Sequence, residues 1–332
     1  MISQVLLLAA LSAPDAAAVI PARFEADRIF ATPQTKGGEP LKIFVDTGGG
    51  SNLLCRSAAE RAGLAIAPLK LEGEDAAELG ENAGKTTPTF RDDSIPANAD
   101  GDASFLVIDC SRGPMGSGMR DGLLSSRWFS GRAWTFDYAA HTLALESKGG
   151  HAPKAAHATP MGLRAKSAEG PAFSMPRLTV RVDGHDLDVL LDTGATGHPT
   201  PAGEAAQGAA AVDGYRATSF ITKSTFDAWH AAHPDWTVVE KGDDIFAPKF
   251  VARLIRVPSV EIAGWRVGPV WFTDRPDGAF RTMMSSMTDK PVEGAIGGNA
   301  LKHFRMTLDY PRGTAYFACV DDCASITPRR AP

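Results

Sequence analysis

Two short apolar runs along the chain end in the same tripeptide, Asp-Thr-Gly. The first covers Leu41–Gly48 (LKIFVDTG) and the second covers Leu187–Gly194 (LDVLLDTG). Each run is too short for a stable helix, is rich in aliphatic residues and is closed by a glycine. Both runs are therefore predicted to be β-strands that deliver the tripeptide into a turn.

The residues around these runs predict turns and one helix. Residues 177–191 alternate on both sides of Val-Asp-Gly-His, which is typical of a β-hairpin. The Lys-Gly-Gly-Glu-Pro segment before Leu41 can make the equivalent turn in the first half. Residues 224–229 (STFDAW) predict a short amphipathic helix, whereas the Ala, Gly and Pro of residues 198–216 predict an inserted loop.

A longer repeat accompanies the tripeptides. Residues 121–145 align without gaps with residues 293–317, so that Thr135 matches Thr307 and Asp137 matches Asp309. Blocks that recur in the same order indicate that the chain arose by duplication. Asp137 and Asp309 each follow a strand-like run and are expected to begin turns.

The middle of the chain predicts a boundary between the two copies. Residues 147–172 are rich in Gly, Ala, Pro and Lys and contain few large apolar residues, as linkers do. The predicted organisation is a first lobe over residues 19–150, a linker region over 151–172 and a second lobe over 173–332.

Composition and charge exclude some classes of partner. The chain has 332 residues, enough for two domains, with 44% hydrophobic and 22% charged residues, as in a globular protein. Its net charge of -5 and the lack of Lys/Arg blocks provide no basic face, so no nucleic-acid partner is expected. No apolar run approaches the roughly 20 residues of a membrane helix, so no membrane partner is expected.

The first 18 residues are typical of a secretory signal peptide. An apolar core at Val5–Leu11 is followed by small residues, including Ala16–Ala18, that suit a signal peptidase. This predicts a secreted or periplasmic protein. The segment lacks the usual Lys or Arg, so an irregular N-terminus on a cytosolic protein is the alternative.

The four cysteines fit an exported protein. Cys319 and Cys323 are close enough in sequence to close a small loop, which leaves Cys55 and Cys110 to pair within the first half. An even count favours disulfides in an exported chain, and four free buried thiols are the alternative. The spacing of Cys319 and Cys323 lacks a partner pair for a zinc site.

Asp46 and Asp192 are the candidate catalytic residues. If the two copies pack about a pseudo-two-fold axis, these carboxyls approach each other and share one proton. One then acts as a base on a water and the other as an acid toward a peptide carbonyl, without metal or cofactor. Gly48 and Gly194 permit close backbone approach, and the threonines before them, Thr47 and Thr193, can hydrogen-bond across to hold the loops together. Two loop carboxylates without activity are the alternative.

These motifs resemble those of the pepsin and retropepsin clan of aspartic endopeptidases, which carry one Asp-Thr-Gly per lobe. Residues 293–301 (EGAIGGNAL), followed by Thr-Leu-Asp-Tyr, are similar to the segment of retropepsin-like domains in which an apolar-apolar-Gly supports the active-site loop. The resemblance implies an all-β, bilobed, pepsin-like fold made of two duplicated retropepsin-like β-barrel lobes with a substrate cleft between them. The shared-proton behaviour of the dyad is known from pepsin and is carried over with the resemblance. On the same basis, the residues that support the two loops are Gly122, Leu123, Leu124, Gly294, Ala295, Ile296 and Gly297.

Four features depart from that pattern. The first copy has Ser125 where a glycine usually packs, and Gly49 where pepsins have a serine. Pepsins also place a tyrosine on a flap hairpin, but no tyrosine lies between residues 55 and 121, so the flap is expected either to use Phe90 or Phe105 or to close in a different way. The first strand-like stretch begins near Ala22, which leaves little room for an inhibitory prosegment.

Other catalytic patterns are weak. His230 and His233 lie one helical turn apart without a third ligand nearby, and His198 follows the second Asp-Thr-Gly loop. The sequence has no Gly-x-Ser-x-Gly, His-Glu-x-x-His or P-loop motif. We therefore expect an aspartic endopeptidase that cleaves an extended peptide or protein substrate as a monomer, with no cofactor and no metal. An exported, non-catalytic peptide-binding module is the alternative function.

Overall fold

The computed structural model describes residues 17–69, 83–111, 116–147, 155–165 and 173–326. Regular structure in these residues is mostly β-strand, which confirms the all-β class. The predicted signal peptide lies outside the described residues except for Ala17 and Ala18, and Ala18 is already the first residue of strand β1 (Ala18–Ile20). No helix in the described ranges is both long and apolar enough to cross a membrane.

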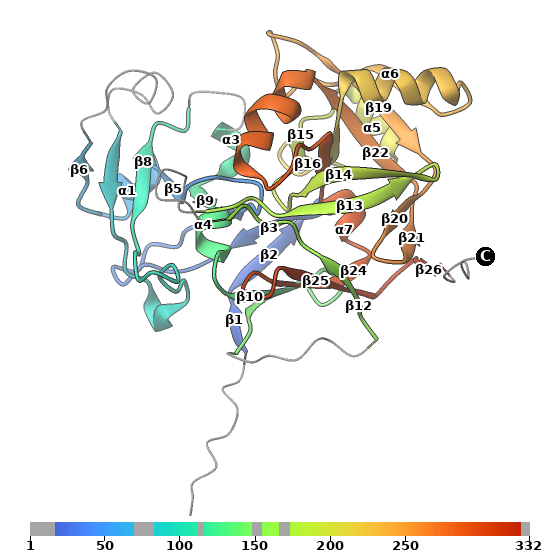
Figure 1. Cartoon of the computed structure of the whole chain (residues 1–332). Helices are drawn as coiled ribbons and strands as arrows, with labels where there is room; N and C mark the ends of the chain where they lie inside the picture. Colours follow the sequence, from blue (N-terminus) through green and yellow to red (C-terminus); the bar gives the residue numbers. More distant parts are fainter. Residues whose placement is uncertain (1–16, 70–82, 112–115, 148–154, 166–172, 327–332) are drawn as a thin grey trace, which may run out of the picture.

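The first half of the chain forms an eight-stranded sheet (Figure 1). In spatial order its strands are β2 (Ala22–Glu25), β3 (Arg28–Ala31), β4 (Ile43–Val45), β9 (Gly122–Leu124), β5 (Leu53–Cys55), β8 (Phe105–Ile108), β7 (Gly84–Thr86) and β6 (Ala67–Pro68). The first apolar run therefore forms a strand, β4, which is fully buried and ends directly before Asp46.

The second half forms a ten-stranded sheet. In spatial order its strands are β18 (Val238–Asp243), β19 (Ala252–Val257), β22 (Val270–Arg275), β17 (Ser219–Thr222), β23 (Gly294–Ile296), β14 (His185–Leu191), β13 (Arg177–Val182), β20 (Val260–Ile262), β21 (Trp265–Val267) and β26 (Ala324–Ser325). The predicted hairpin is the β13–β14 pair, whose turn residues Asp183 and Gly184 both have positive φ, as a two-residue hairpin turn requires.

Seven neighbouring strands recur in the two large sheets with the same order and the same directions. Strand β4 runs parallel to β9, and β14 runs parallel to β23. Next to these pairs, β5 lies between β9 and β8, and β17 lies between β23 and β22. This match of topology supports the duplication predicted from the sequence repeat.

A six-stranded sheet joins the two halves. In spatial order its strands are β1, β11 (Thr142–Leu145), β10 (Ala133–Asp137), β24 (Phe304–Asp309), β25 (Thr314–Cys319) and β12 (His157–Pro160). At its centre β10 and β24 pair antiparallel, and Thr135 lies opposite its repeat partner Thr307. Figure 1 shows this sheet below and between the two larger ones.

Asp137 and Asp309 begin turns, as predicted. The backbone N–H of Ala140 donates to Oδ1 of Asp137 at 2.9 Å, and that of Arg312 donates to Oδ1 of Asp309 at 3.0 Å. Each carboxylate thus satisfies the backbone three residues ahead of it, which favours a tight turn.

Part of the predicted linker is regular structure. Residues 157–160 form β12, which pairs with β25 from His157 opposite Phe317 to Pro160 opposite Thr314. The linker prediction otherwise falls partly on residues 151–154 and 166–172, which lie outside the described residues. The lobe boundaries themselves stay a prediction.

Six α-helices and one small two-stranded sheet complete the described elements. They are α1 (Arg56–Arg61), α3 (Gly116–Met119), α4 (Ser126–Phe129), α5 (Pro201–Gln207), α6 (Lys223–Ala232), α7 (Gly298–Leu301) and the pair β15 (Thr196–Gly197) and β16 (Arg216–Ala217). Short 3-10 and π turns lie at Arg91–Asp93, Ala279–Met283 and Met284–Met287. Helix α6 contains the predicted amphipathic segment.

The prediction of a loop over residues 198–216 is wrong in part, because α5 forms there. The hydroxyl of Thr200 accepts a hydrogen bond from the N–H of Gly203, Pro201 occupies the first turn, and Gly208 ends the helix with a φ of 65°. These are helix start and stop signals, and the alanines between them have high helix propensity.

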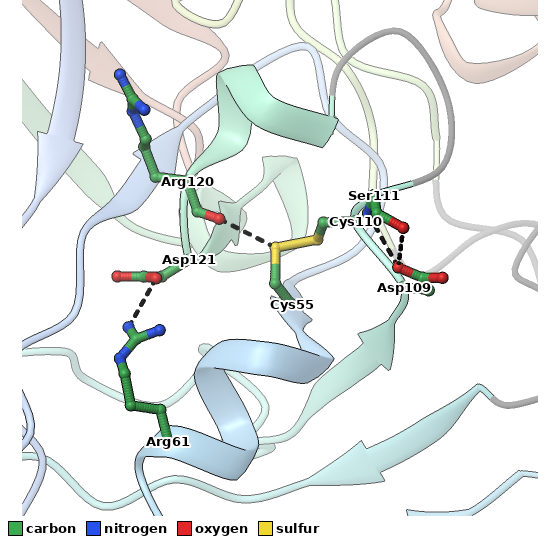
Figure 2. Close-up of a disulfide and its surroundings, with 7 residues drawn as sticks. All are labelled: Cys55, Arg61, Asp109, Cys110, Ser111, Arg120 and Asp121. Atoms are coloured by element: carbon green, nitrogen blue, oxygen red, sulfur yellow. Dashed lines mark hydrogen bonds and ion pairs between the residues drawn. A yellow bond between two sulfur atoms is a disulfide. The ribbon is translucent and has the colours of Figure 1, made fainter.

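Two disulfides join the predicted cysteine pairs, Cys55 with Cys110 and Cys319 with Cys323. Figure 2 shows the first pair next to Asp121, the residue before β9. The N–H of Cys55 donates to the carbonyl of Asp121 at 2.8 Å, and Arg61 binds the carboxylate of Asp121 at 2.8 Å. The disulfide therefore lies where the chain enters β9, the strand that supports the first Asp-Thr-Gly loop.

Candidate active site

Asp46 and Asp192 each follow a strand that has a parallel neighbour. Asp46 follows β4, which pairs with β9, and Asp192 follows β14, which pairs with β23. The N–H of Asp46 donates to the carbonyl of Leu124 at 2.8 Å, and the N–H of Asp192 donates to the carbonyl of Ile296 at 3.0 Å. Leu124 and Ile296 are repeat partners, so the two aspartates leave equivalent strands in equivalent ways. The parallel pairs β4–β9 and β14–β23 therefore fix both loops.

The two threonines exchange hydrogen bonds across the interface between the halves. The N–H of Thr47 donates to Oγ1 of Thr193 at 3.1 Å, and the N–H of Thr193 donates to Oγ1 of Thr47 at 3.0 Å. The hydroxyl of Thr47 then donates to the carbonyl of Leu191 at 2.7 Å, and that of Thr193 donates to the carbonyl of Val45 at 3.0 Å. Both threonines are fully buried. The four bonds hold the loops together, as the sequence predicted.

Gly48 and Gly194 lie against the carboxylate of the opposite half. A Cβ at Gly48 would lie 2.5 Å from Cγ of Asp192, and a Cβ at Gly194 would overlap the carboxylate of Asp46. Each glycine also donates its N–H to the aspartate of its own loop at 2.8 Å. Only glycine leaves room for the two aspartates to meet.

The residues predicted to support the loops lie behind them. A side chain at Gly122 would overlap the carbonyl of Leu53, and one at Gly294 would overlap that of Phe220. Leu123 lies opposite Leu53 on β5, and Ala295 lies opposite Phe220 on β17. Gly297 faces Ala195, with 2.8 Å between a Cβ at Gly297 and the Cβ of Ala195.

Ser125 is accommodated by local polar contacts. Its hydroxyl lies 3.0 Å from Oδ1 of Asn52 and its N–H donates to the same atom at 3.1 Å, so the buried side chain is satisfied. In the second half, Gly297 faces Ala195, and the equivalent pair in the first half is Ser125 and Gly49. Each pair thus contains one glycine.

Gly49 also has a steric reason. A Cβ there would lie 2.9 Å from Oδ2 of Asp46, which leaves little space for the serine of pepsins.

Burial raises the pKa of both aspartates, and the pKa of Asp46 rises well above its usual range. At Asp46, the charge of Asp192 and the hydrogen bond between the two carboxyls raise the pKa further. At Asp192, the hydrogen bond from Asp46, two backbone N–H groups and the charge of Arg275 oppose the effect of burial. Because the pKa of both carboxyls is raised and the two lie close together, the pair holds one proton between them instead of ionising at both sites.

A cavity of about 190 Å³ opens at the two carboxylates. The first half contributes Asp46 and Gly48, and the second half contributes the other lining residues, among them Phe220, Phe246 and Arg275. The sequence reasoning missed these last three residues. Each lies within or after a strand of ordinary composition, and only the folded sheet brings it to the aspartates.

The candidate flap residues do not lie at this cavity. Phe90 and Phe105 are both buried, and their ring centroids are 6.4 Å apart in an edge-to-face contact. Neither lines the cavity. The prediction that one of them covers the aspartates is therefore wrong, because both are used to fill the core of the first half.

The histidines singled out in the sequence have other contacts. His198 lies 2.5 Å from Oδ1 of Asp244, and His233 lies 2.7 Å from Oδ2 of Asp183 and stacks on Trp236. His230 is exposed on α6. The described residues contain no cluster of three or more His, Cys, Asp or Glu side chains placed to hold a metal ion.

No family model matches the chain, and no curated protein matches it significantly.

Proposed function

We propose that this protein is an aspartic endopeptidase in which Asp46 and Asp192 activate a water molecule that hydrolyses a peptide bond. The observation that carries the proposal is the hydrogen-bonded pair of half-buried carboxyls at the cavity, held by two Asp-Thr-Gly loops that exchange threonine hydrogen bonds. Bringing two carboxyls together out of water costs stability, and pairs with a strongly perturbed pKa are typical of functional sites.

The proposed reaction needs one ionised and one protonated carboxyl. Asp192, as the carboxylate, takes a proton from water while the water oxygen attacks the carbonyl carbon of the peptide. Asp46 gives its proton to the carbonyl oxygen, and a tetrahedral diol forms. Asp192 then gives its proton to the amide nitrogen while Asp46 takes one from a hydroxyl of the diol. The C–N bond breaks, a carboxylic acid and an amine are released, and the starting protonation of the pair is restored. The raised pKa of both carboxyls favours a pair that holds one proton, as this reaction requires.

The duplicated topology supports the finer proposal of a bilobed, pepsin-like fold. Seven strands recur around the two loops, and the central sheet joins the halves at Thr135 and Thr307. Because one chain carries both aspartates, the proposed reaction requires no dimer. The two disulfides favour an oxidising compartment, which supports export to the periplasm or the exterior.

The experiment that tests the proposal is digestion of a denatured protein by the wild type, Asp46→Asn and Asp192→Asn across acid to neutral pH. Each substitution removes acid–base catalysis, so we expect cleavage to fall roughly 10²–10⁴-fold in both variants and to be blocked by a pepstatin-type inhibitor. Peptide binding by the wild type without cleavage at any pH would favour the non-catalytic binding module instead.

A further inference from the structure

Within the described part of the chain, one cation, Arg275, lines the cavity beside the two aspartates. It is the last residue of β22 and pairs in register with Thr222 of β17. Its guanidinium carbon lies 3.6 Å from the ring centroid of Phe246 and 4.8 Å from that of Phe220. Stacking on these rings holds the guanidinium in place without using its hydrogen-bond donors.

The charges of Asp243, Asp192 and Asp274 act on Arg275, but in the described part of the chain none of these carboxylates accepts a hydrogen bond from its guanidinium. Asp274 accepts hydrogen bonds from the N–H of Arg253 at 2.7 Å and from its Nε at 2.8 Å. Asp243 accepts the N–H of Ile245 at 3.1 Å. Among the described residues, the guanidinium of Arg275 makes no hydrogen bond or ion pair, and its Nε is buried without a partner.

Arg275 nevertheless stays positively charged at neutral pH, because burial lowers its pKa only to about 10. A partly buried cation whose Nε has no hydrogen-bond partner is unfavourable, and a carboxylate is the group that best satisfies its planar donors. The guanidinium of Arg275 therefore offers hydrogen-bond donors to a ligand in the cavity, since no other described residue accepts them.

We propose that this cavity is a subsite in which Arg275 binds a carboxylate of the peptide substrate next to the cleaved bond. This inference rests on the proposed peptidase function. A volume of about 190 Å³ is enough for one side chain, since an engineered cavity of about 150 Å³ holds a benzene molecule. The apolar residues Phe280 and Met284 also line it and can pack against the methylene groups of such a side chain.

Two substrate groups have this chemistry. One is the side chain of an internal Glu or Asp, which would make the protein cleave beside acidic residues. The other is the free α-carboxylate at the end of a peptide, which would make it release short C-terminal fragments. Both would form the same bidentate contact with Arg275.

The decisive measurement is kcat/KM for matched peptides. One pair has Glu or Gln beside the cleaved bond, and a second pair has a free or an amidated C-terminus. We expect the wild type to prefer the carboxylate member of one pair about tenfold or more, and Arg275→Gln to abolish that preference. Arg275→Lys keeps the charge and should retain part of it. The ratio within a pair is unaffected by any general loss of activity that the substitution causes through Asp192.

Arg256→Gln is the matched control. Arg256 is exposed on β19, the strand next to β22, and does not line the cavity. The control should keep the wild-type ratio. If the wild type cleaves both members of each pair equally, or if Arg275→Gln keeps the preference, the carboxylate subsite is wrong while the peptidase function stands.

Failure of the peptidase function itself would give a different result. If no peptide is cleaved, the same four peptides are tested for binding to the wild type and to Arg275→Gln by fluorescence anisotropy. Tighter binding of a carboxylate peptide that disappears in Arg275→Gln would support the subsite without peptidase activity. Equal or absent binding of all four peptides would overturn the subsite as well.

Discussion

Thr135 and Thr307 lie directly opposite each other on antiparallel strands, with their hydroxyl oxygens 2.7 Å apart. They are repeat partners separated by 172 residues, so their contact marks the point where the two copies meet. The hydrogen bonds between Thr47 and Thr193, which are 146 residues apart, mark the same relationship at the aspartates. Equivalent residues of the two copies therefore contact each other both in the central sheet and at the candidate active site.

Removing one hydroxyl from the threonine pair should destabilise the fold. In Thr193→Val, the N–H of Thr47 and the carbonyl of Val45 lose their partners in a buried site, at about 1–3 kcal/mol each. We expect a loss of about 2–5 kcal/mol in the free energy of unfolding, measured by urea denaturation. Thr193→Ser, which keeps the hydroxyl, should lose about 1 kcal/mol for its methyl group. Equal losses in both variants would show that the hydroxyl bonds do not hold the loops.

A methyl group at Gly48 should disrupt the aspartate pair more than the fold. In Gly48→Ala, the new Cβ would lie 2.5 Å from Cγ of Asp192, so the two carboxyls must separate. We expect kcat/KM to fall by about 10²-fold or more, because misplacement of about 1 Å has such an effect. Gly37→Ala is the control, because a Cβ there meets only Oγ1 of Thr35 at 3.8 Å. Wild-type activity in Gly48→Ala would mean that the two carboxyls need not be in contact.

The raised pKa values predict how stability depends on pH. An aspartate whose pKa is higher in the folded state keeps its proton when the unfolded chain has lost it, so its presence lowers stability as pH rises above about 4. Asp46→Asn should therefore be more stable than the wild type at pH 7, by roughly 1.4 kcal/mol per unit of pKa elevation, and the gain should vanish near pH 3.

Asp277→Asn is the control for this pH effect, because it has the opposite sign. The N–H of Ser224 lowers the pKa of the half-exposed Asp277, so replacing this carboxylate should reduce stability at pH 7 and have little effect near pH 3. The free energy of unfolding of the wild type and of both variants is measured by urea denaturation at several pH values. A stability difference between Asp46→Asn and the wild type that does not change with pH would contradict a raised pKa at Asp46.

The two disulfides should contribute unequally to stability. A disulfide stabilises the fold by lowering the conformational entropy of the unfolded chain. This contributes about 4 kcal/mol for a loop of 55 residues and about 2 kcal/mol for a loop of 4 residues. We therefore expect the double variant Cys55→Ser/Cys110→Ser to unfold at a lower urea concentration than Cys319→Ser/Cys323→Ser. The reverse order would mean that contacts in the folded state outweigh the restriction of the unfolded chain.

Local patterns in the sequence predicted the parts of the site that repeat. The two apolar runs before Asp46 and Asp192, the supporting blocks and the cysteine pairs are all visible as spacing or similarity along the chain. Residues brought to the site by the sheet were not predictable in this way. Arg275 is the clearest case, because its neighbours Phe220 and Phe246 come from other segments and only the fold places it at the cavity beside the two aspartates.

Two errors have specific physical causes. The loop predicted over residues 198–216 contains α5 because Thr200, Pro201 and Gly208 supply helix-end signals that outweigh the loop-like composition. Phe90 and Phe105 were candidate flap residues by position, but apolar rings that can be buried in the first-half core are more stable there than over a cavity.

The pH dependence of kcat/KM tests the shared proton most directly. One protonated and one ionised carboxyl are required together, so the account predicts a bell-shaped profile, with its two limbs set by the Asp46–Asp192 pair, and loss of activity at every pH in Asp46→Asn and Asp192→Asn. A profile that only rises with pH, or activity that survives in either variant, would contradict the account.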